Sequence, residues 1–151
     1  MTDGGLSIEE LKSKIGANLE PLVYEIEKGM LQRFAQAIGD PNPLWQDDEY
    51  AAKSTFGAVI APPTFILTLG FDQIVYRLSQ NPSQTVLHGS TELDYYHPVS
   101  HGDVITVTTE IAAVRQREGK AGKTTFITFD ITYKNQEQEV VAKCRQRAII
   151  Y

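Results

Sequence analysis

The sequence predicts an α+β domain in which a curved antiparallel sheet wraps around one long central helix. From residue 104 onward, segments rich in Val, Ile and Thr alternate apolar with polar residues, as in an antiparallel sheet with one packed face and one wet face. Before them, the apolar residues of Ala61–Gln80 cover more than one helical face, which is typical of a helix enclosed by other structure. With 151 residues and 42% hydrophobic residues, the chain predicts a single domain over residues 1–151 with a substantial core.

Two short elements are expected at the N-terminal end of the chain. Ser7–Leu19 places apolar residues four positions apart, which predicts a leading helix within an extension over residues 1–20. Leu22–Ile26 alternates apolar and polar residues over a few positions, which predicts a short strand.

Two helices are expected next. Lys28–Ile38 predicts a helix that ends at Gly39. Asp47 has the side chain of a good N-cap for a second, brief helix over Asp48–Lys53. The residues expected on the buried side of the first of these helices are Met30, Phe34, Ala37 and Ile38.

The long helix and the strands complete the pattern. The helix is expected to begin at Pro62-Pro63, where the missing N–H groups cost least, and to stop before Asn81-Pro82. Strands are expected over Val104–Val114, Thr124–Tyr133 and residues 140–150. A single apolar helix against a curved antiparallel sheet is the arrangement called the hot-dog fold.

Composition argues against several classes of protein. The formal net charge of −5 and the absence of any Lys/Arg run disfavour nucleic-acid binding. One cysteine, Cys144, excludes an internal disulfide framework and fits a reducing cytoplasm. No apolar run approaches the roughly 20 residues needed to cross a bilayer, and the polar start Met1–Gly5 does not resemble a signal peptide. The expectation is a cytoplasmic protein that does not engage membranes.

The most informative segment is Gly-Asp-Pro-Asn-Pro-Leu-Trp, at Gly39–Trp45. Together with the preceding Phe34–Ile38 it resembles the hydratase signature of the MaoC-like hydratases and dehydratases. Ile60–Phe65 resembles the N-terminal MaoC-like dehydratase domain type, related to R-specific enoyl-CoA hydratases. Two further segments also match the family: Leu87-His-Gly-Ser, and Tyr96-His-Pro-Val followed by His101-Gly-Asp. The resemblance extends from about Val23 to Tyr151.

The resemblance implies a specific chemistry. Catalytic members act on trans-2-enoyl or 3-hydroxyacyl thioesters of CoA or acyl carrier protein, with an Asp and a His as acid and base. A backbone N–H at the start of the central helix stabilises the thioester oxygen. Asp40 stands at the Asp position, but Trp45 stands at the His position, and an indole has one N–H donor and no acceptor. Trp45 is therefore expected to fill space or wall off a vacated cleft.

The other candidate site residues carry less chemistry. Pro63 aligns with the glycine whose N–H polarises the thioester carbonyl in the family, and proline has no N–H; the N–H of Thr64 lies next to it. Asn42 is expected to orient either the turn or Asp40. Asp40 and Asn42 are also common turn residues, and that role needs no catalysis. His88 is the most attractive replacement histidine, ahead of His97 and His101, although it also suits a structural role in a strand.

Three functions remain open at this point. The first is a non-catalytic, acyl-binding subunit that pairs with a catalytic MaoC-like subunit, since hot-dog domains of this type work in pairs. The second is an active homodimeric enoyl-CoA hydratase that uses Asp40 and a displaced histidine. The third is an acyl-thioester-binding protein without a reaction. None involves a metal or a nucleotide cofactor, because the three histidines have no paired spacing and no Gly-rich phosphate loop is present.

Overall fold

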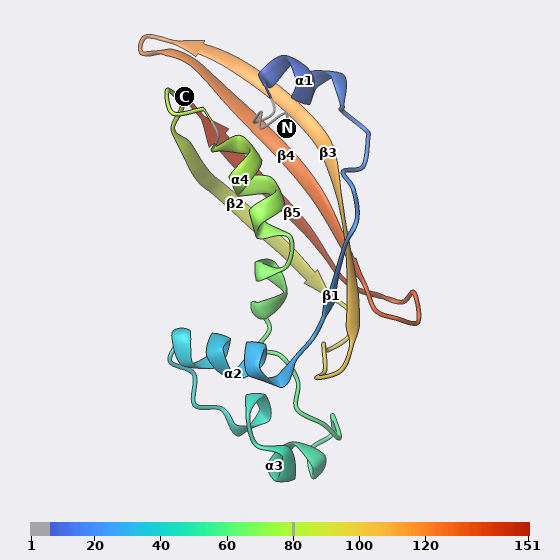
Figure 1. The fold of residues 1–151 in the computed structure, drawn as a ribbon. Coiled ribbons are helices and arrows are strands. Elements are labelled where there is room, and N and C mark those ends of the chain that lie inside the picture. The colour runs from blue at the N-terminus through green and yellow to red at the C-terminus, as the bar shows by residue number, and fades with distance from the viewer. Residues whose placement is uncertain (1–6, 80) are drawn as a thin grey trace.

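A five-stranded antiparallel sheet in the order β1-β3-β4-β5-β2 forms the body of the protein. The computed structural model describes residues 7–79 and 81–151. The sheet is long and curved, and β3 and β4 form its longest hairpin (Figure 1). Its strands are β1 (Leu22–Glu25), β2 (Val86–Tyr95), β3 (Val104–Gly119), β4 (Gly122–Lys134) and β5 (Val140–Ile150).

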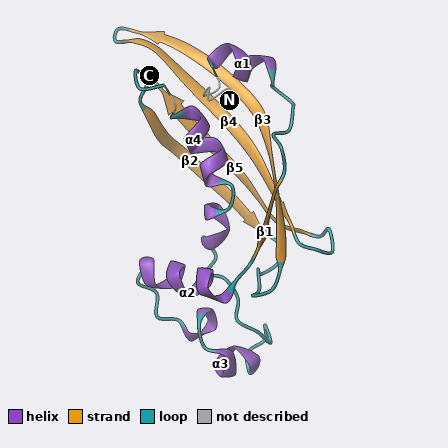
Figure 2. Cartoon of the chain, in the orientation of Figure 1, coloured by secondary structure: helices purple, strands orange, loops and turns teal. Residues whose placement is uncertain are grey.

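Apart from α1, which lies beside β3, the helices divide into a central segment and a cluster at one end of the sheet. α4 lies against one face of the sheet, and α2 and α3 lie together below it, away from the β3–β4 hairpin turn (Figures 1 and 2). No helix within residues 7–79 and 81–151 is long and apolar enough to span a bilayer. The helices are α1 (Ile8–Ser13), α2 (Lys28–Ala37), α3 (Asp48–Ala52) and α4 (Phe71–Leu78), with 3-10 turns η1 (Pro43–Trp45) and η2 (Phe65–Thr68).

The core lies between α4 and the inner face of the sheet. In β4 every second side chain is buried, as the alternation predicts: Ile127, Phe129, Ile131 and Tyr133. In α4, Ile74 and Leu78 are buried in the same cluster. This hot-dog architecture confirms the predicted fold class.

Two helical expectations near the N-terminus are only partly right. The leading helix covers Ile8–Ser13 instead of Ser7–Leu19, with Ser7 as its N-cap. The chain then runs along β3, where Leu19 N–H donates to Thr109 O at 2.7 Å. In α2 the buried side chains are Leu31 and Ala35. The expected burial of Ala37 and Ile38 is wrong, because the helix ends there and Ile38 is 49% exposed.

The expected continuous helix over Ala61–Gln80 is two shorter helices. η2 ends at Thr68, Leu69 is extended, and α4 begins after Gly70. Gly70 has φ of +79° and donates its N–H to the hydroxyl of Tyr24 at 3.0 Å. The break therefore replaces a helical hydrogen bond with a bond to β1. Gln80, the expected last residue, lies outside the described residues.

Gly70→Ala is expected to lower the free energy of unfolding by about 1–3 kcal/mol. The left-handed backbone disfavours a side chain, and a Cβ at this position meets Val107 Cγ1 at 3.1 Å. Gly39→Ala is the matched control, because Gly39 has φ of +67° and nothing within 4 Å of its Cβ position. Urea unfolding followed by circular dichroism compares the two variants. Equal losses would contradict the steric part of the argument.

Candidate functional site

The turn between α2 and η1 positions Asp40. Gly39, with φ of +67°, turns the chain at the end of α2, and Asp40 N–H donates to Ala35 O at 3.0 Å. Asn42 N–H then donates to Asp40 Oδ1 at 3.0 Å, and Asn42 Oδ1 accepts from Leu44 N–H at 3.0 Å. Asp40 and Asn42 thus build the turn through successive side chain to backbone bonds of the kind that Asp and Asn favour.

Trp45 occupies the place beside Asp40. Its Nε1–H donates to Asp40 Oδ2 at 2.9 Å, and its side chain is 7% exposed and packs with Ala35 and Ile60. Both oxygens of Asp40 therefore accept hydrogen bonds from within the same turn. Because the indole has no acceptor nitrogen, this pair holds a carboxylate in place but does not relay a proton.

An apolar groove of about 380 Å³ opens beside Trp45. The pairing of Ile60 with Ser100, and the bond from Ala61 N–H to Val99 O at 2.7 Å, bring the segment before η2 next to the segment after β2. The groove is lined by Leu44, Trp45, Phe56, Ile60, Ala61, Pro63, Tyr95, Tyr96, His97 and Pro98. Such a mostly apolar hollow suits a hydrophobic ligand.

The groove contains some of the predicted site residues and adds others. Trp45 and Pro63 line it, whereas Asp40 lies behind the indole. Thr64 is exposed and immediately follows Pro63 at the start of η2. Sequence reasoning missed four groove residues, Phe56, Tyr95, Tyr96 and Pro98, whereas His97 is one of its candidate histidines. The aromatic pair Tyr95-Tyr96 was the available signal, but the contacts between the segments around Ile60 and Ser100 are what bring it to the site.

His88 does not join this group. It lies near the start of β2, which is the end of that strand away from α2 and α3 (Figure 1). It is exposed, and its Nε2 is 3.2 Å from Thr91 Oγ1. Among the three histidines, His97 is the one that lines the groove.

Two tyrosine hydroxyls are buried, and one of them belongs to the groove residue Tyr95. Tyr95 and Tyr133 flank Ala142 on neighbouring strands, and neither hydroxyl has a hydrogen-bond partner within the described part of the chain. Burial raises the pKa of Tyr95 to about 12 and raises that of Tyr133 as well. Both side chains are therefore neutral at physiological pH.

Tyr133→Phe is expected to leave the free energy of unfolding unchanged or to raise it by about 1 kcal/mol, because an unpaired buried hydroxyl is costly. Tyr24→Phe is the matched control: its hydroxyl accepts from Gly70 N–H, so its loss is expected to destabilise by about 1 kcal/mol. Thermal unfolding of both variants is the measurement. A larger loss in Tyr133→Phe than in Tyr24→Phe would show that the Tyr133 hydroxyl has a partner.

The remaining reactive side chains do not form a second centre. Cys144 is 3% exposed, and burial raises the pKa of its thiol to about 11, which makes it a packed thiol instead of a nucleophile. Within residues 7–79 and 81–151, no three His, Cys, Asp or Glu side chains gather as metal ligands.

Comparison with known proteins places this site in a family. The FAS1-like, dehydratase domain region matches residues 13–144. A UPF0336 protein of Streptomyces avermitilis is 34% identical over 114 residues, which cover 72% of this chain and 75% of that protein. The chain belongs to the MaoC-like dehydratase family. A second relative of this MaoC-like protein is a probable enoyl-CoA hydratase alpha subunit of Thermomonospora curvata, 25% identical over 80% of this chain and 43% of the relative.

Solved structures share the fold of this MaoC-like protein. A monoamine oxidase regulatory protein from Archaeoglobus superposes with a TM-score of 0.81, at 24% identity over 99% of this chain and 97% of that one. An R-hydratase from Pseudomonas aeruginosa gives 0.75, at 20% identity over 95% and 84%. The HadBC 3R-hydroxyacyl-ACP dehydratase complex of Mycobacterium tuberculosis gives 0.72, at 19% identity over 86% and 91%.

Proposed function

We propose that this chain is the non-catalytic, acyl-binding subunit of a heteromeric enoyl-thioester hydratase or 3-hydroxyacyl-thioester dehydratase. The observation that carries the proposal is the 2.9 Å bond from Trp45 Nε1 to Asp40. A catalytic dyad needs a base that accepts a proton and an acid that returns one. Here the residue beside the carboxylate only donates, so Asp40 has no partner for proton transfer in this turn.

Pro63 supports the same conclusion from the other side of the groove. The family resemblance aligns it with the glycine whose N–H polarises the thioester carbonyl, and Pro63 lines the groove that Trp45 also lines. Without that N–H, one donor to the developing oxygen charge is lost, and such a donor contributes about 10²- to 10³-fold in rate. The same groove therefore lacks two catalytic groups, the histidine that Trp45 replaces and the N–H that Pro63 does not have.

In this proposal, the groove binds the acyl part of a CoA or carrier-protein thioester, and a catalytic MaoC-like subunit with an intact Asp and His performs the reaction. The HadBC dehydratase and the alpha subunit of Thermomonospora curvata support a two-subunit arrangement, since their names describe a complex and a subunit. No cofactor is involved beyond the thioester. The free, buried Cys144 suits a reducing cytoplasm, which is where we place the complex.

The test is turnover of crotonyl-CoA, followed by loss of enoyl absorbance, with this chain alone and with a MaoC-like subunit that carries Asp and His. We expect no turnover by the chain alone and turnover on mixing. Asp40→Asn in this chain is expected to change the rate of the mixed complex by less than about threefold, because Asp40 transfers no proton. A loss of about 100-fold or more in this variant would identify Asp40 as catalytic and overturn the proposal.

One observation favours a second candidate, the homodimeric hydratase with a displaced histidine. His97 lines the same groove as Trp45. In this candidate the indole moves aside, so that a water molecule bridges Asp40 and His97 as an acid and base pair. This candidate requires turnover by the chain alone that is abolished by both Asp40→Asn and His97→Gln. Acyl-CoA binding without turnover in any mixture would instead indicate the third function, a binding protein.

A further inference from the structure

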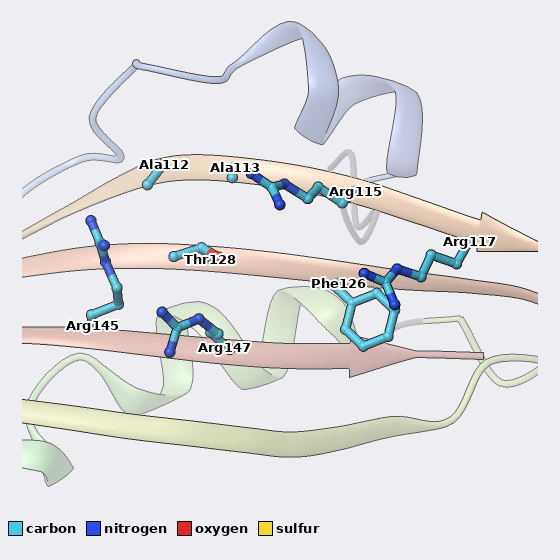
Figure 3. A pocket seen from close by; sticks show the side chains of 8 residues that line it. All are labelled: Ala112, Ala113, Arg115, Arg117, Phe126, Thr128, Arg145 and Arg147. Carbon is cyan, nitrogen blue, oxygen red and sulfur yellow. The ribbon is translucent and has the colours of Figure 1, made fainter.

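Four arginines gather on the outer face of the sheet, away from α4 and from the groove. Arg115 and Arg117 lie on β3, Arg145 and Arg147 lie on β5, and β4 runs between them (Figure 3). Together with Phe126, Thr128 and two alanines they line a hollow of about 430 Å³. We call these four side chains the arginine stripe. The chain as a whole has a formal net charge of −5, so the stripe is a local departure from an acidic surface.

A β-bulge places half of the stripe on this face. In β3 the odd-numbered residues up to Ile111 face the core, and the register shifts between Ile111 and Ala113. After the shift the odd-numbered residues face outward, so Arg115 and Arg117 emerge beside Phe126. If β3 continued in regular alternation through Ala112, with no bulge, both guanidinium groups would point into the core, because a shift of one residue reverses every side chain.

The four arginines form a staggered line. Their pairing partners on β4 are Thr124 for Arg117, Phe126 for Arg115, Thr128 for Arg147 and Asp130 for Arg145. Along the strand direction, successive arginines are thus two residues apart, or roughly 6.8 Å, over a total of about 20 Å. The step from Arg115 to Arg147 also crosses β4, which adds two strand spacings, or about 9.6 Å, sideways. Figure 3 shows the same order along the strands.

Two of the four arginines bind carboxylates, and the other two have no ion-pair partner among the described residues. Arg145 binds Asp130 through two bonds of 2.7 Å, and Arg147 binds Glu92 at 2.6 Å. Arg117 lies 5.9 Å from the Phe126 ring. Neither Arg115 nor Arg117 has an ion-pair partner among the described residues. Two charged donors are therefore available to an outside ligand, and the other two are already oriented.

We propose that the arginine stripe is a docking surface for an acidic segment of a partner protein. Carboxylates at positions i and i+4 of a helix are about 6 Å apart, which matches the spacing of the two arginines within each strand, and Phe126 offers an apolar contact at the centre of the stripe. Arginine is enriched in protein interfaces for this combination of charge and flat surface. The surface lies on the opposite face from α4, so it is separate from the proposed acyl groove and does not depend on the proposed function.

Two other kinds of ligand fit the stripe less well. A single phosphate group reaches only part of a line about 20 Å long. A nucleic acid would bring its phosphates against Asp130 and Glu92, which lie among the arginines, and against the net charge of −5. A protein segment of mixed composition avoids both conflicts.

The test uses a fluorescein-labelled helical peptide of about 18 residues with glutamate at every fourth position, and a matched peptide with glutamine at those positions. Fluorescence anisotropy at low salt measures binding to the full chain. We expect the glutamate peptide to bind at least about tenfold more tightly than the glutamine peptide, and to weaken with added salt. Arg115→Glu with Arg117→Glu is expected to reduce that binding at least about tenfold.

Arg33→Glu with Lys53→Glu is the matched control, because it makes the same change in net charge in the α2 and α3 cluster, away from the stripe, and is expected to change binding by less than about threefold. Arg115→Gln with Arg117→Gln removes the charges without adding new ones, and it keeps the test informative if the glutamate variant does not fold. Equal binding of the two peptides, or no binding of either, would overturn the proposal. So would tighter binding of adenosine 3′,5′-bisphosphate or of a single-stranded oligonucleotide that the Arg115 and Arg117 variants abolish.

Discussion

Replacing Trp45 with alanine is expected to lower the free energy of unfolding by about 3–5 kcal/mol. The indole is 7% exposed and packs between Ala35 and Ile60, so its removal opens a cavity where α2, η1 and the segment before η2 meet. It also removes a hydrogen-bond donor from Asp40. The cavity and the missing hydrogen bond both lie at this contact, which holds the cluster of α2 and α3 together.

Trp45→Phe separates the two contributions. Phenylalanine keeps most of the buried volume but has no N–H, so this variant is expected to lose only about 1–2 kcal/mol. Urea unfolding followed by far-ultraviolet circular dichroism measures both variants. If phenylalanine cost as much as alanine, the bond to Asp40 would contribute more to stability than the packing of the indole.

The second large effect is a gain of activity. Trp45→His combined with Pro63→Gly is expected to produce turnover of crotonyl-CoA at least about 100-fold above the background rate without protein, since a positioned acid and base contributes about 10²- to 10⁴-fold. The histidine would stand where an N–H now lies 2.9 Å from Asp40. The glycine would restore an N–H in the groove that Trp45 lines.

Each single variant serves as a control and is expected to gain less than the pair. The double variant with Asp40→Asn is expected to return to the parent rate, which ties any turnover to the dyad. Circular dichroism checks that the variants are folded, because replacing the indole weakens the core. A folded double variant without turnover would mean that the groove lacks a further catalytic feature beyond these two.

Much of the fold follows from local patterns in the sequence. The alternation in β4 predicts its buried face because side chains in a strand point to opposite sides in turn. Asp47 predicts the start of α3 because its carboxylate accepts from Tyr50 N–H at 3.0 Å. These features depend on neighbours within a few residues, so the sequence displays them.

Other features depend on contacts between distant segments. The break at Gly70 depends on Tyr24, which lies 46 residues away along the chain, and a run of apolar residues does not reveal it. The bulge after Ile111 looks like continued alternation until the register with β4 is known. The groove is hidden for the same reason, since Phe56 and Tyr96 come to line one groove through the pairing of the segments around Ile60 and Ser100.

The bond between Trp45 and Asp40 also gives the protein an optical property. Trp45 is the single tryptophan of the chain, and it lines the groove while its N–H is held by a carboxylate. The intrinsic emission of the protein under selective excitation at the red edge of its absorption band therefore comes from this one position. A ligand that enters the groove meets the only such fluorophore in the molecule, so its arrival can be followed without any label.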